Sequence, residues 1–188
     1  MRRHGNFLTG FMAIGLVMGL LAPSWSASGQ TYRVIPGESK ISYHLHHPMH
    51  EIEGVSKDFD CVVVLGGDTA YAQIRVKAQV ASFSSGNTNR DSHMLEILDG
   101  LKYPFVEFVS DSLRHEDEGY RVFGELTFHG VRRPVDFKAT PVHLKNGVEI
   151  KGDFVVLLSD YQVERPSLLF VPTANDLHID LDVFLAEL

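Results

Sequence analysis

The chain has 188 residues, with 24 Asp and Glu against 17 Lys and Arg, and a formal net charge of −7 at pH 7. This acidic balance argues against nucleic acid as a partner and against electrostatic docking on anionic lipid. Cys61 is the single cysteine. An intrachain disulfide is therefore excluded, and the fold must depend on its hydrophobic core.

The N-terminal segment is typical of a secretory signal. Residues 1–4 are basic, residues 7–22 are apolar, and small serines follow. This pattern predicts a signal peptide over 1–28 and a single mature domain over 29–188, located in the periplasm or secreted. The apolar run falls short of the about 20 residues of a spanning helix, so we expect no stable membrane insertion of the mature chain. An uncleaved N-terminal anchor is the alternative.

After Gly29 the sequence alternates between polar and apolar residues with a period of two, which is typical of strands with one buried face. Turn signals such as Pro36-Gly37, His129-Gly130 and Asn146-Gly147 separate these stretches. Many one-sided strands with short connections predict an all-β fold, either an antiparallel barrel or a sandwich. The expected strands are 31–35, 40–47, 59–65, 74–80, 105–113, 119–128, 133–141, 148–158 and 179–185.

One segment departs from this alternation. Asn87 and its neighbours are good helix caps, and Asp91 falls in the first turn, where the helix dipole favours an acid. Apolar residues recur at helical spacing up to Gly100, which marks an end. A short helix is therefore expected over residues 90–99, with an apolar stripe facing the strands. The stripe comprises Met94, Leu95, Leu98 and Leu101.

Arg90, Asp91 and His93 form the most distinctive polar cluster. In one interpretation they lie at a cavity mouth, where His93 donates to a ligand carbonyl. In the other they form a structural hydrogen-bond network, in which Asp91 accepts from Arg90 or a backbone amide and holds the helix against the strands. Both interpretations remain open at the level of sequence.

A second cluster consists of histidines. His44 and His46 share one face of an expected strand, and His50 or Glu51 follows in the next loop. Two histidines two residues apart on one strand can chelate a metal. One candidate function is therefore that of a periplasmic metal-binding protein that uses His44, His46 and His50, and we treat it as the alternative to the lipid-binding function described below. A solvated strand face is the simpler explanation, because no Cys or second His-x-His pair supports a site.

The mature region is rich in aromatic residues. On inward strand faces they could surround an elongated apolar cavity, or they could fill an ordinary core. The candidates are Tyr43, Phe83, Phe105, Phe108, Phe123, Phe128, Phe154 and Phe170.

The sequence contains neither a Gly-x-Ser-x-Gly elbow nor a phosphate-binding loop. These motifs therefore give no support for nucleophilic catalysis or for phosphate binding. A barrel enzyme acting on a lipid, with Arg90 and His93 as polar catalysts, is the third hypothesis.

The order and spacing of two motifs resemble those of the YceI-like polyisoprenoid-binding family. The resemblance implies a secreted, lipocalin-like barrel of about eight strands that carries a long isoprenoid lipid or an isoprenoid quinone. It also implies a binding protein without a cofactor, and not an enzyme. Residues 158–170 depart from the family pattern and leave the ligand's identity open. The first motif is Arg90-Asp91-Ser92-His93-Met94 with Tyr103-Pro104, and the second is Gly124-Glu125-Leu126-Thr127 with Gly130-Val131 and Pro134-Val135.

Overall fold

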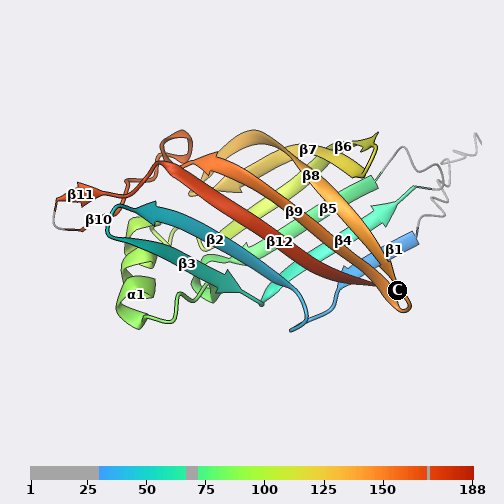
Figure 1. Ribbon diagram of the computed structural model, residues 1–188, viewed down its shortest axis with the longest axis horizontal. Coiled ribbons are helices and arrows are strands. Elements are labelled where there is room, and N and C mark those ends of the chain that lie inside the picture. Colours follow the sequence, from blue (N-terminus) through green and yellow to red (C-terminus); the bar gives the residue numbers. More distant parts are fainter. Residues whose placement is uncertain (1–29, 67–71, 169) are drawn as a thin grey trace, which may run out of the picture.

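The structure is a computed structural model that describes residues 30–66, 72–168 and 170–188 (Figure 1). The predicted signal peptide lies outside these residues. Within them, no helix is both long and apolar enough to cross a membrane.

Strands dominate the described residues, and every strand predicted from alternation forms. The strands are β1 (Gln30–Val34), β2 (Lys40–His47), β3 (His50–Ser56), β4 (Phe59–Leu65), β5 (Ala72–Gln79), β6 (Phe105–Glu116), β7 (Gly119–Phe128), β8 (Val131–Leu144), β9 (Gly147–Leu157), β10 (Ser167–Leu168), β11 (Val171–Pro172) and β12 (Asp176–Glu187). The helices are η1 (Val80–Ser82), α1 (Thr88–Ile97) and η2 (Leu158–Tyr161).

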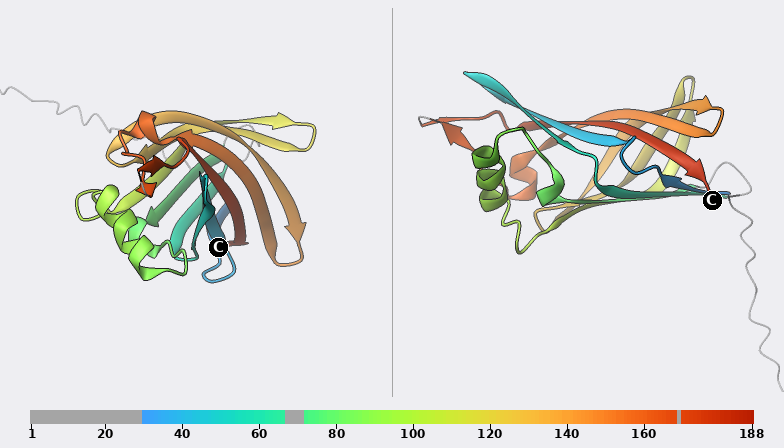
Figure 2. Two further views of the ribbon diagram at one scale, coloured as in Figure 1. Left: turned by 60° about the vertical axis from the view of Figure 1, so that its left-hand side comes forward. Right: turned by 90° about the horizontal axis from the view of Figure 1, so that it is seen from below.

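Eight antiparallel strands close into a barrel in the order β1-β4-β5-β6-β7-β8-β9-β12. Closure comes from β12, which returns to pair with β1, so that Val34 lies opposite Leu185. Figure 2 shows the curved wall from two further sides. The open choice between barrel and sandwich is thereby resolved in favour of the barrel, as the family resemblance implied.

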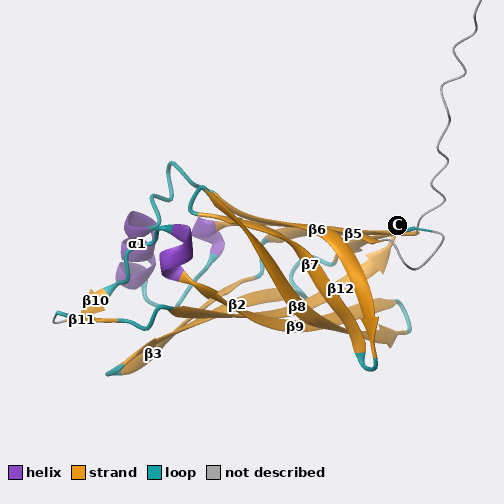
Figure 3. Cartoon of the chain, turned by 90° about the horizontal axis from the view of Figure 1, so that it is seen from above, coloured by secondary structure: helices purple, strands orange, loops and turns teal. Residues whose placement is uncertain are grey.

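The β2–β3 hairpin extends the wall beyond the closed part of the barrel. Residues 177–182 of β12 pair with β2, on the same edge that pairs with β1 nearer the C-terminus. β3 pairs with β2, and its other edge makes an isolated bridge between Val55 and Ser84. Between β3 and β5 the wall is therefore continued by η1, α1 and the segment that joins them (Figure 3).

Helix α1 forms as predicted, shifted two residues toward the N-terminus. The side chain of Asn87 accepts hydrogen bonds from the amides of Asn89 and Arg90, which confirms the predicted cap. The helix stops before Gly100, because Leu98 is the C-cap and Asp99 adopts a left-handed φ of 46°. Leu101 lies beyond this stop and is fully exposed, so its predicted place in the apolar stripe is wrong.

The core consists of two groups of inward-facing side chains. One group centres on Phe108, Val122 and Phe137, and the other on Ile41, Phe59 and Cys61. Burial raises the pKa of the Cys61 thiol to about 12. Cys61 is therefore a small buried apolar residue of the wall, as expected for an isolated structural cysteine.

Candidate functional site

The barrel encloses an apolar cavity of about 390 Å³. Inward-facing side chains from the strands of the wall line it, and α1 contributes further residues at one end. The volume lies within the about 300–1,000 Å³ typical of small-molecule sites. Apolar linings of this kind bind through buried area, and the few polar groups at the edge orient the ligand.

Five of the aromatic candidates line the cavity: Tyr43, Phe83, Phe108, Phe128 and Phe154. Phe137 joins them, although the sequence analysis did not select it. Its ring stacks on Phe154 at a centroid distance of 5.1 Å and lies 5.4 Å from Phe108. One aromatic cluster thereby joins β6, β8 and β9 across the inner wall, with β7 lying between β6 and β8.

The other three aromatic candidates lie outside the cavity. Phe105 is directed outward beneath Lys77, whose Nζ lies 4.0 Å from the ring centroid. Phe123 alternates with the buried Val122 and faces Arg114 on the outer surface. Phe170 is exposed at the turn between β10 and β11. Strand alternation accounts for the first two, because neighbouring residues point to opposite faces.

Arg90 and His93 line the α1 end of the cavity. The Arg90 side chain is held in place by Ser85, because Nε donates to its hydroxyl at 2.8 Å and Nη2 donates to its carbonyl at 2.7 Å. His93 is freer, since its side chain is 60% exposed and its Nδ1 lies 3.5 Å from a carboxylate oxygen of Glu96. His93 can therefore reorient toward a polar ligand group, whereas the guanidinium of Arg90 already donates to Ser85.

Asp91 belongs to a structural network and does not line the cavity. Its carboxylate accepts from the amide of Ser85 at 2.9 Å, from the Ser85 hydroxyl, and from the Ser84 hydroxyl at 3.2 Å. Ser84 in turn exchanges backbone hydrogen bonds with Val55 of β3. Partial desolvation would raise the pKa of Asp91, but the hydrogen bonds from Ser85 and Ser84 outweigh it and hold that pKa below its ordinary value. Asp91 thus ties the first turn of α1 to β3.

Tyr43 spans the region between β3 and α1. Its ring lies directly over Gly54, where a Cβ would collide with it, and its hydroxyl donates to the sulfur of Met94 at 3.4 Å. Burial raises the pKa of Tyr43, the charge of Asp91 adds to the rise, and Arg90 opposes it. The neutral phenol is therefore the form that borders the cavity.

The histidines of the alternative metal site do not converge. His44 pairs with Asp180 at 2.9 Å, His46 pairs with Glu51, and the ring of His50 lies 5.2 Å from that of His47. Across residues 30–66, 72–168 and 170–188, no three His, Cys, Asp or Glu side chains are placed to share a metal ion. The structure therefore offers no geometric support for the metal-binding alternative.

The barrel and its apolar interior define a lipocalin-like binding fold. Residues 32–185 match the YceI-like domain, and the chain belongs to this family.

Two curated relatives carry the designation UPF0312. One from Photorhabdus laumondii is 32% identical over 133 residues, or 67% of this chain and 69% of that protein. Another, from Pseudomonas putida strain F1, is 41% identical over 95 residues, or 47% of this chain and 48% of the relative. The match therefore spans about half the length of the Pseudomonas putida protein.

Solved structures share the fold. BcnA from Burkholderia cenocepacia superposes with a TM-score of 0.74 at 22% identity, covering 80% of this chain and 98% of BcnA. A polyisoprenoid binding domain from Saccharophagus degradans superposes with a TM-score of 0.65 at 11% identity, covering 84% and 98% respectively. At these identities the likeness concerns the fold alone.

Proposed function

We propose that this protein binds one long isoprenoid chain, of a polyprenyl lipid or an isoprenoid quinone, inside the barrel and carries or sequesters it without catalysis. The apolar cavity of about 390 Å³ carries this proposal, because polar side chains approach it mainly at its ends. The similarity to a polyisoprenoid binding domain supports the same class of ligand.

The chemistry of the cavity favours a hydrocarbon chain with a small polar group. Each buried methylene contributes about 0.8 kcal/mol, so a chain of several isoprene units offsets the cost of ordering it. At the α1 end, the ring of His93 and the hydroxyl of Tyr43 can meet an oxygenated head, because the hydroxyl donates only to the weak acceptor sulfur of Met94. We therefore orient the ligand with its head toward α1.

Blocking the cavity tests the proposal. Ala139 on β8 lines the cavity, whereas Val142 on the same strand is exposed outside it. We expect Ala139→Phe to lower the uptake of a long polyprenyl alcohol, measured by native mass spectrometry, and Val142→Phe to leave uptake unchanged. If circular dichroism shows that both variants are folded, equal uptake by the two would contradict binding inside the barrel.

We also propose that the protein is exported, with residues 1–28 as the signal peptide. The basic start and apolar run of the sequence support this. Mass analysis of the exported protein should give an N-terminus between Ala27 and Gln30. A retained Met1 on exported protein would rule out the cleavage.

A further inference from the structure

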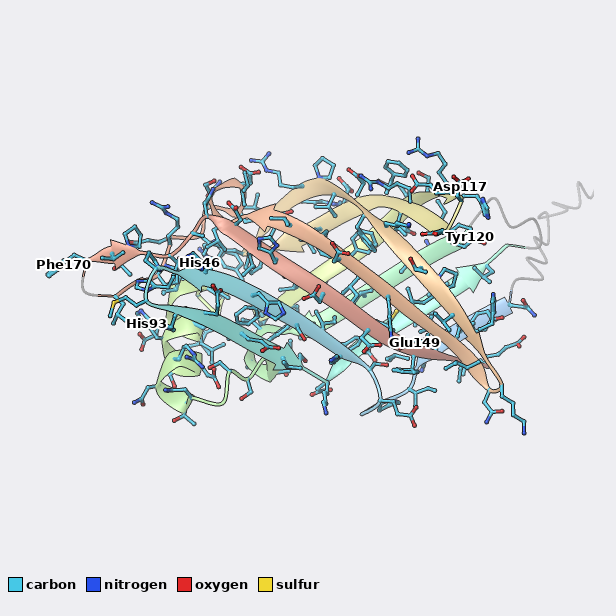
Figure 4. The ribbon with its side chains drawn as sticks, viewed as in Figure 1. His46, His93, Asp117, Tyr120, Glu149 and Phe170 are labelled. Atoms are coloured by element: carbon cyan, nitrogen blue, oxygen red, sulfur yellow. The ribbon has the colours of Figure 1, made fainter. Side chains whose placement is uncertain are left out.

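Two adjacent hairpins at the α1 end expose large apolar side chains. Phe170 is 99% exposed, Met49 61%, Leu168 44% and Val171 39%. We call these four residues the apolar tip. Single exposed apolar residues are common on protein surfaces, but a cluster on a projecting element marks an interaction site. Figure 4 shows Phe170 at the extreme end of the molecule, beyond His46 and His93.

Hydrogen bonds fasten the two hairpins of the apolar tip to each other. The buried ring of His47, 1% exposed, donates from Nε2 to the carbonyl of Val171 at 3.0 Å and accepts at Nδ1 from the amide of Met49 at 3.2 Å. One side chain therefore joins the β2–β3 turn to the β10–β11 hairpin. The hairpin is closed at its base by the amide of Thr173, which donates to the carbonyl of Pro166 at 2.8 Å.

The backbone at Phe170 is unusual for its residue type. Its φ of 66° lies in the left-handed region, which Gly and Asn adopt readily and other residues adopt at a cost. The fold thus presents a large aromatic side chain to solvent from a turn position where Asn would be less strained. Strain of this kind, at an exposed position, points to a role outside the stability of the fold.

The apolar tip is continuous with the mouth of the cavity. Pro166, at the base of the hairpin, is itself part of the cavity lining, as are Arg90 and His93 of α1. Figures 1 and 3 show β10 and β11 projecting past α1 at this end. A surface that receives the apolar tip therefore faces the end of the barrel where we place the ligand's head.

We propose that the apolar tip inserts into the surface of a lipid bilayer and docks the cavity mouth there. This inference rests on the proposed function, because a bilayer is where an isoprenoid chain dissolves. The sequence carries no charged side chain from residue 166 to 175. β10 and β11 project beyond α1, a position from which apolar side chains can reach between lipid headgroups (Figure 1). Without residues 1–28 the protein has 24 Asp and Glu against 15 Lys and Arg, so it would dock through apolar insertion and not through attraction to anionic lipid.

Flotation with vesicles of pure phosphatidylcholine tests the docking. Phe170→Asn removes the aromatic ring and relieves the strained turn, so its thermal stability should equal or exceed that of the wild type. Its partitioning onto vesicles should fall by about tenfold or more. Leu144→Asn is the matched control, because it removes an exposed apolar side chain near the β8–β9 turn, away from the apolar tip. We expect this control to float like the wild type.

Three outcomes would overturn the docking proposal. In the first, the wild-type protein does not float, and in the second, Phe170→Asn floats as well as the wild type. In the third, flotation is lost at about 1 M salt, where charges are screened beyond ~3 Å, which would mean that charge and not apolar insertion holds the protein on the vesicle. A wild type that stays off vesicles but self-associates through Phe170, seen by sedimentation, would assign the apolar tip to a second copy of the chain. Uptake of a long polyprenyl alcohol in the absence of vesicles separates the two proposals. Docking can fail while every variant still binds this alcohol, whereas the proposed function fails if none of them does.

Discussion

Backbone hydrogen bonds hold the wall of the barrel together, whereas side chains hold its α1 end. Around the wall each strand pairs with both neighbours, and β12 completes the circle with β1. At the α1 end, β3 has one bridge to Ser84, and the contacts of Asp91 and Tyr43 join the helix to the strands. Side-chain contacts open locally more easily than a ladder of backbone bonds. We therefore expect the α1 end to open locally before the wall does.

The largest effect is expected in the wall. Phe137→Ala removes the central ring of the Phe108–Phe137–Phe154 cluster. Because buried Phe→Ala substitutions create cavities, the free energy of unfolding should fall by about 3 kcal/mol in urea titrations. A loss below about 1 kcal/mol would show that the wall does not depend on this cluster.

The next effect is expected at the α1 end. Gly54→Ala places a Cβ against the ring of Tyr43. The ring must move, and it loses its contact with Met94. Unfolding free energy should fall by about 1–2 kcal/mol, and hydrogen exchange should accelerate in α1 while the amides of β7 and β8 stay protected. Uniform acceleration across all strands would contradict the separation of the two regions.

A smaller, pH-dependent effect is expected for Asp91→Asn. The pKa of Asp91 is lowered in the folded state, so its carboxylate stabilises the fold above its unfolded pKa of about 3.9. That contribution is lost as pH falls through the folded value. At pH 7 the variant should lose about 1 kcal/mol, a fall of roughly 2–4 °C in Tm. The difference from the wild type should shrink as pH falls below the unfolded pKa of about 3.9, and a difference that stays constant with pH would assign the loss to packing alone.

The smallest effect on stability is expected for His93→Ala, because this side chain is largely exposed. Its Tm should change by less than about 1 °C. Binding of an oxygenated isoprenoid, measured by calorimetry, should weaken by about 1 kcal/mol, whereas a pure hydrocarbon chain should bind unchanged. Equal losses for both ligands would mean that His93 contacts the chain and not the head.

Much of this wall could be predicted from the sequence, because each strand has one apolar face that the alternation reveals. β3 could not, since its inward positions include Gly54 and Ser56, which carry no apolar signal. Gly54 is needed there because the ring of Tyr43 occupies the space of a side chain. Strand β10 could not be predicted either, because its two residues are too few to show any periodicity.

Parts of the site were predictable in kind and not in detail. Phe105 and Phe108 lie three positions apart in one strand and so point to opposite faces, which would have excluded Phe105 from the cavity. The cap at Asn87 was readable from residue type alone. Which of Arg90, Asp91 and His93 faces the cavity depends on Ser84 and Ser85, whose hydrogen bonds no local pattern indicates.

The pairing of β12 with β1 has a consequence for the order in which this protein can fold. Tyr32 lies opposite Glu187, so the final seam of the barrel joins residues from the two ends of the described chain. Until β12 has emerged from the ribosome, β1, β2 and β9 each lack a neighbour, and the growing chain is an open sheet with unpaired edges. Such distant pairings form slowly. A nascent chain therefore stays unclosed, and prone to associate with other chains, until β12 is made.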